Sequence, residues 1–140
     1  MKNNDLNRFI DAQQHDYAIA LQEIKNGRKR SHWMWYIFPQ VQGLGFSEMS
    51  RRYAINDLEE AVAYLADPVL GQRLVEISGA LLDLQGADAG AIFGNPDDMK
   101  LRSSMTLFAS VPGANPVFDK VLQKFFKGVK DIKTLRLLGL

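Results

Sequence analysis

Residues 6–27 have the sequence LNRFIDAQQHDYAIALQEIKNG, which is the strongest indication of the fold in this chain. Apolar residues recur in it at steps of three and four, namely Leu6, Phe9, Ile10, Tyr17, Leu21 and Ile24. This spacing places them on one face of an amphipathic α-helix. We expect Asn4 or Asp5 to cap the start of the helix and Gly27 to end it in a left-handed conformation.

Five further helix starts follow along the chain, each marked by a capping residue or a proline. They lie at Asn56, Asp67–Pro68, Asn95–Pro96, Pro116 and Asp131. No stretch alternates between polar and apolar side chains as a half-buried strand does. The pattern predicts an all-α fold, with residues 1–140 in a single compact multihelical domain of five to seven helices and at most a vestigial pair of strands.

The run WMWYIF, Trp33–Phe38, has six large apolar residues and no period, so helix, strand and irregular structure all stay open for it. The helix after Asn95–Pro96 is clearer, because its spacing puts Leu101, Met105 and Phe108 on one face. We expect these three side chains to be buried together with apolar residues of the other helices, namely Phe9, Leu74, Leu81, Leu122 and Phe125.

The composition limits the possible functions. The 140 residues are 46% hydrophobic, which is typical of a globular chain. There are 17 Lys and Arg and 16 Asp and Glu, so the net charge of +1 predicts no nucleic acid partner. The absence of cysteine excludes thiolate chemistry. No signal peptide and no apolar run of membrane-spanning length is found, which favours a cytoplasmic protein without a membrane partner. We expect no metal and no cofactor, because no binding motif for either is present.

Two polar segments are unusual, and the first is RKRSHWMWYIFPQ, Arg28–Gln40. Its cations can neutralise a phosphate while an aromatic ring stacks on a base or another flat ring. The ligand-binding candidates in it are Lys29, Arg30, Ser31, His32, Trp33 and Trp35. The alternative is that the aromatic residues belong to the core and the cations to a solvated turn.

The second unusual segment is KLRSSMT, Lys100–Thr106, whose ligand-binding candidates are Lys100, Arg102, Ser103 and Thr106. On a regular helix Lys100 and Arg102 diverge by about 160°, so only one of them can face a ligand shared with the first segment. We expect Arg102 with Thr106 to face it, and Lys100 to pair with a carboxylate such as Asp97 or Asp98. A polar helix surface is the alternative.

No motif assigns a reaction, and the candidate catalytic residues are His32, Asp98 and Glu48. His32 is the one imidazole in these two segments. Asp98 also suits the positive end of a helix, which is a purely structural explanation for it. A concave site lined by both segments favours a ligand, whereas a flat apolar patch favours a protein partner.

Several stretches resemble the DUF1810 family, a domain of unknown function. They are LNRFIDAQ (6–13), GRKRSHWMWYIFPQ (27–40), GLG (43–45), YLADPVLGQRL (64–74), IFGNPDDMKLRSSMTLFA (92–109) and FFKG (125–128). The resemblance covers nearly the whole chain and implies a small, mostly helical bacterial protein without an established activity. Some members carry the label calpastatin, which this chain does not support, because an inhibitor of that type is long and disordered.

A more remote similarity is to the NADAR superfamily, in the order of an aromatic-rich segment, the turn FGNPDD (93–98) and a polar helix. Those helical proteins are implicated in cleaving N-glycosidic bonds in ADP-ribose-type compounds. KLRSS (100–104) stands where the superfamily has a small-residue motif, so no catalytic role is transferred. The resemblance implies that any activity would be that of an N-glycosidase or hydrolase acting on a nucleotide derivative.

Together these observations predict a protein that binds an anionic nucleotide-like or ADP-ribose-like small molecule. Whether it also catalyses a reaction of this molecule stays open. The alternative is a protein–protein interaction module without catalytic activity. The sequence does not specify an oligomeric state.

Overall fold

A computed structural model describes residues 5–140, in which helices account for every regular element apart from one isolated bridge. The helices are α1 Asn7–Lys25, α2 Met34–Ile37, α3 Glu48–Arg52, α4 Leu58–Ala66, α5 Leu70–Leu82, α6 Ala89–Phe93, α7 Asp97–Ala109, α8 Val117–Phe126 and α9 Ile132–Leu137. The bridge pairs Val41 with Ile55 in parallel. The predicted all-α class is confirmed, and α2, α3 and α6 are single turns that the periodicity did not separate from their flanking loops.

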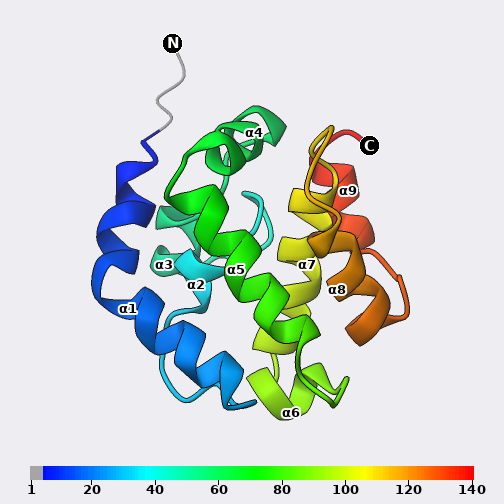
Figure 1. The fold of residues 1–140 in the computed structure, drawn as a ribbon. Helices are drawn as coiled ribbons and strands as arrows, with labels where there is room; N and C mark the ends of the chain where they lie inside the picture. Colours follow the sequence, from blue (N-terminus) through cyan, green and yellow to red (C-terminus); the bar gives the residue numbers. More distant parts are fainter. Residues whose placement is uncertain (1–4) are drawn as a thin grey trace.

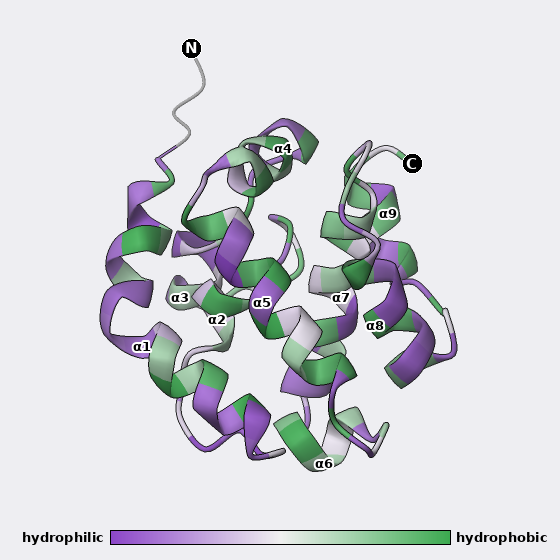
Figure 2. Ribbon diagram, in the orientation of Figure 1, coloured by the Kyte–Doolittle hydropathy of each residue, from purple (hydrophilic) through white to green (hydrophobic). Residues whose placement is uncertain are grey.

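Helix α5 lies across the front of the molecule in Figure 1, between α1 on one side and α7 and α8 on the other. It packs on α1, α4 and α8, while α7 packs on α4, α6, α8 and α9. Hydrophobic and hydrophilic residues alternate along α1, α5 and α8, as Figure 2 shows, so each helix has an apolar side to bury. One hydrophobic core therefore connects elements from both ends of the chain.

The helix ends follow the expected capping chemistry only in part. Asp131 caps α9 as predicted. Asp67 accepts from the N–H groups of Val69 and Leu70, but α5 begins at Leu70 with Val69 at its capping position, so the predicted start at Asp67–Pro68 is two residues too early. Helix α4 is capped by Asp57 instead of Asn56, because the Asp57 carboxylate accepts from the N–H of Glu60.

The start of α1 also differs from the prediction. Leu6 occupies the capping position and no side chain caps it, so Asp5 does not have the expected role, and Asn4 lies outside the described residues. At the other end, Gly27 has a φ of +79°, the left-handed conformation predicted for the end of α1.

The predicted core is largely confirmed. Phe108 is fully buried, with its ring 5.1 Å from that of Tyr64 and 5.9 Å from that of Phe118. Leu101 and Met105 of the same face are buried as well. The exception is Phe125, which is only partly buried against the core. It lies in the last turn of α8, next to the end of that helix, where fewer neighbours enclose a side chain.

The unassigned run Trp33–Phe38 forms α2, a single helical turn inside the core. Trp33 is 1% exposed and contacts the rings of Phe38 and Phe93, whereas Trp35 stays partly exposed. The run has no helical period because it is buried almost all round, not on one face. In the part of the chain that the structure describes, no helix is both long and apolar enough to cross a membrane.

Candidate functional site

The loop after α1 is held by a single carboxylate, that of Glu23. It accepts hydrogen bonds from the N–H of Arg30 at 2.8 Å, from the N–H and Oγ of Ser31 at 3.0 and 2.6 Å, and from Nε1 of Trp33 at 2.9 Å. Partial burial opposes the ionisation of Glu23, but these four hydrogen bonds outweigh it and lower its pKa to about 2. The loop is therefore fixed to the last turns of α1.

Lys29 of this loop reaches the start of α7. Its Nζ lies 3.0 Å from Oδ2 of Asp97 and 5.0 Å from the centre of the Trp33 ring, and the side chain is only 8% exposed. Its backbone N–H donates to the carbonyl of Ile92 in α6 at 2.7 Å. The Lys29 charge is thus satisfied by an ion pair and an aromatic face, which suits a residue that joins the first polar segment to α6 and α7.

Lys100 lies at the same carboxylate from the other side. Its Nζ is 3.5 Å from Oδ1 of Asp97 and 5.6 Å from the centre of the Trp35 ring, and its side chain is 25% exposed. Lys29, Trp35, Asp97 and Lys100 are here called the Trp35–Lys100 surface. Lys29 and Trp35 come from the first segment that the sequence singled out and Lys100 from the second, while Asp97 lies one turn before Lys100 in α7. The predicted pairing of Lys100 with a carboxylate is observed.

The structure reverses the expected orientation of the second cation. Arg102 and Thr106 face the start of α9, where a guanidinium nitrogen is 3.9 Å from Asp131 and Thr106 Oγ1 accepts from the Asp131 N–H at 3.0 Å. Ser103 Oγ also donates to Asp131. The side chains of Lys100 and Arg102 point about 160° apart on a regular helix. Only Lys100 therefore lies beside the first polar segment, Arg28–Gln40. Ser104 is buried, and its Oγ has no hydrogen-bond partner within residues 5–140.

The three candidate catalytic residues are not assembled into one group. His32 is exposed, Asp98 accepts from the N–H of Met99 at the start of α7, and Glu48 is exposed in the first turn of α3. No hydrogen bond or ion pair within the described residues joins any two of them. The same part of the chain holds no group of three His, Asp or Glu side chains that could bind a metal ion.

The concave sites of the molecule lie elsewhere. Three surface cavities have volumes of about 280, 230 and 320 Å³, and neither Trp35 nor Lys100 lines any of them. The largest of the three is lined by Arg51 of α3 and by Asn56 of the segment between α3 and α4. None of these three cavities is therefore the concave site, lined by both polar segments, that was expected for a ligand.

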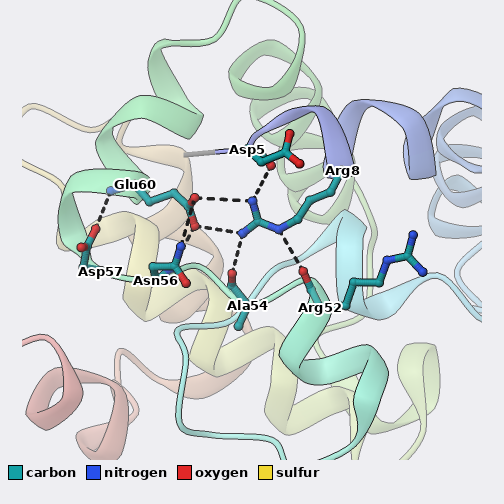
Figure 3. A network of polar contacts seen from close by, with 7 residues as sticks. All are labelled: Asp5, Arg8, Arg52, Ala54, Asn56, Asp57 and Glu60. Atoms are coloured by element: carbon teal, nitrogen blue, oxygen red, sulfur yellow. Dashed lines mark hydrogen bonds and ion pairs between the residues drawn. The ribbon is translucent and has the colours of Figure 1, made fainter. Parts of the chain in front are cut away.

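Sequence reasoning missed a buried ion pair beside that largest cavity. Glu60 is fully buried, and Arg8 of α1 donates to its carboxylate at 3.0 Å and to the carbonyls of Arg52 and Ala54 at 2.9 and 2.7 Å (Figure 3). The N–H of Asn56 donates to the same carboxylate at 2.9 Å. The sequence does indicate that Glu60 is buried, because Glu60 lies one helical turn before Tyr64 and therefore on the same face of α4.

Comparison with known proteins gives a family but no activity. No curated protein matches the chain. Among solved structures, a conserved hypothetical protein from Mycobacterium tuberculosis is similar, with 48% sequence identity, a TM-score of 0.94 and a match covering 97% of each chain. The family model DUF1810, described as a protein of unknown function, matches residues 3–138. Since this match spans almost the whole sequence, the chain belongs to the DUF1810 family.

Proposed function

We propose that this protein binds a small anionic molecule with a flat ring, such as a nucleotide derivative, on the Trp35–Lys100 surface. The observation that carries the proposal is the meeting of two distant polar segments at Asp97, with one lysine from each. One carboxylate faces two ammonium groups there, so one positive charge is left over. An anion close to Lys100 would neutralise that charge.

The two lysines have different roles in this proposal. Lys29 is almost buried and lies closer to Asp97, so it positions the loop and neutralises the carboxylate. Lys100 is more exposed and lies farther from Asp97, so it is the cation that an incoming anion can reach. Trp35 is partly exposed beneath Lys100 and offers its ring to a base or another flat group. We propose no catalysed reaction, because His32, Asp98 and Glu48 do not form one catalytic group.

A thermal-shift series separates the charge contribution from the ring contribution. We expect AMP and ADP-ribose to raise Tm, and adenosine and ribose 5-phosphate to raise it less, since each of the latter lacks the anion or the base. A ligand at 100 times its Kd adds about 2.7 kcal/mol to the free energy of unfolding. If none of the four compounds raises Tm, the protein does not bind this class of ligand and the interaction-module alternative is favoured.

Two substitutions and a control locate the binding surface. Lys100→Met should weaken AMP binding by about tenfold or more, because a charge-assisted hydrogen bond contributes about 1.5–3 kcal/mol. Trp35→Leu should weaken AMP and adenosine alike. Lys120→Met removes a positive charge from the exposed side of α8 and should leave binding unchanged. Equal effects of Lys100→Met and Lys120→Met would contradict the proposed location.

A further inference from the structure

The cavity beside α3 has features of a second ligand site. Its volume of about 320 Å³ lies at the lower end of the range of small-molecule sites, about 300–1,000 Å³. None of its lining residues belongs to the Trp35–Lys100 surface. They are Gln42, Gly43, Gly45, Phe46, Arg51 and Asn56.

Two independent sets of contacts hold the walls of this cavity. The Val41–Ile55 bridge joins them, with the N–H of Ile55 donating to Gln40 O and the N–H of Gln42 donating to Ile55 O, both at 2.8 Å. On the other side, Arg8 binds the carbonyls of residues 52 and 54 while its guanidinium pairs with the buried Glu60 (Figure 3). A site held in this way loses little conformational freedom when a ligand binds.

Glycine at two positions gives the loop its shape. Gly43 has a φ of +104°, a conformation that other residues rarely adopt. At Gly45 a Cβ would lie 2.5 Å from Cβ of Ser50, so the loop lies directly against α3. The GLG motif is thus explained by the close approach of loop 42–46 to α3, which brings Phe46 and Arg51 to one cavity.

The lining chemistry specifies the class of ligand. The Arg51 guanidinium makes no hydrogen bond or ion pair with any residue in 5–140, and such a planar group pairs with both oxygens of a carboxylate or phosphate. Phe46 is 73% exposed, which leaves its ring free to stack on another flat ring. We propose that this cavity binds a small molecule in which an oxyanion, either carboxylate or phosphate, is attached to a flat ring.

The test is an NMR titration of the full chain labelled with ¹⁵N, using benzoate and phenyl phosphate as probes. Benzamide and inorganic phosphate serve as controls that lack the charge or the ring. We expect saturable shifts at the backbone amides of Gln42, Gly43 and Gly45 and at Nε of Arg51 with at least one of the two probes, and weaker effects from both controls. The stronger probe identifies the oxyanion. No saturable shift with either probe, or equal affinity for phosphate alone, overturns the proposal.

Variants then separate this cavity from the Trp35–Lys100 surface. Arg51→Gln should weaken binding of the preferred probe by at least about tenfold, and Phe46→Ala by several-fold. Both side chains are exposed, so both variants should fold. Lys100→Met should leave the probe's affinity unchanged when it is measured from the shifts at Gln42, Gly43 and Gly45 alone, even if the probe also binds to the Trp35–Lys100 surface. If Lys100→Met abolishes probe binding while Arg51→Gln does not, the ligand occupies the other surface and the cavity proposal is wrong.

Discussion

Glu23 illustrates how much of the local structure one side chain can hold. Its carboxylate collects four hydrogen bonds from Arg30, Ser31 and Trp33, and partial burial is the one effect that opposes its ionisation. The balance lowers its pKa from an ordinary value of 4.5 to about 2. The folded chain therefore stabilises the ionised form.

We expect Glu23→Gln to lower the free energy of unfolding at neutral pH by about 1–2 kcal/mol, because the hydrogen bonds lose their charge. Since the folded pKa lies below the unfolded one, the contribution of Glu23 is present above about pH 4.5 and is lost as the pH falls toward 2. Urea unfolding of both proteins across this range measures the effect. A stability difference that stays constant with pH contradicts it.

At the scale of elements, the last helix depends on another single carboxylate. Oδ2 of Asp131 accepts from the N–H of Thr134 at 3.2 Å and from Ser103 Oγ of α7 at 3.0 Å. The same group therefore begins α9 and ties it to α7. This short helix has only six residues, which is too few for stability without such contacts.

Asp131→Ala should lower the free energy of unfolding by about 1–3 kcal/mol, because it removes the cap and leaves Ser103 without one acceptor. Asp131→Asn should lose less, since asparagine is also a good capping residue. Urea unfolding gives the two values, and hydrogen exchange of the α9 amides shows whether this helix opens first. Equal losses for the two variants are inconsistent with a capping role.

At the scale of the whole molecule, a buried ion pair joins α1 to α4. Arg8 and Glu60 are 52 residues apart in the sequence, and Glu60 is completely enclosed. Arg8→Ala should destabilise the protein by about 3–5 kcal/mol, because it leaves a buried carboxylate without its partner. The double variant Arg8→Ala with Glu60→Gln should recover part of this loss. No recovery in urea unfolding would show that the ion pair is not the cause.

The burial of three phenylalanine rings predicts how much each contributes to the free energy of unfolding. Phe108→Ala should cost about 3–5 kcal/mol, because the ring is fully enclosed between Tyr64 and Phe118. Phe125→Ala should cost less, since that ring is only partly buried. Phe46→Ala should change stability by less than about 0.5 kcal/mol. Urea unfolding of the three variants checks the order, and any other ranking contradicts the assigned burial.

The sequence by itself determined the helical class, the burial of Leu101, Met105 and Phe108 in α7 and several helix ends, but not that Ser103, Ser104 and Thr106 of the same helix are buried too. These features depend on residues within one or two helical turns of each other, so spacing and capping chemistry are enough. The short helices α2, α3 and α6 were beyond this reasoning, because a single turn is too short to have a period. The sequence correctly predicts a helix after residue 56, but the residue that caps α4 is Asp57 and not Asn56, so a helix start can differ by one residue from its prediction.

Only the tertiary structure decided which polar groups meet. Lys29 and Lys100 share Asp97, whereas Arg102 turns to Asp131, and Arg8 finds Glu60 across the chain. The helix geometry around Lys100 and Arg102 separates them in direction, but it does not say which direction faces the first segment. That choice follows from how α6, α7 and α9 pack, and packing is set by contacts between residues far apart in the sequence, which local patterns do not contain.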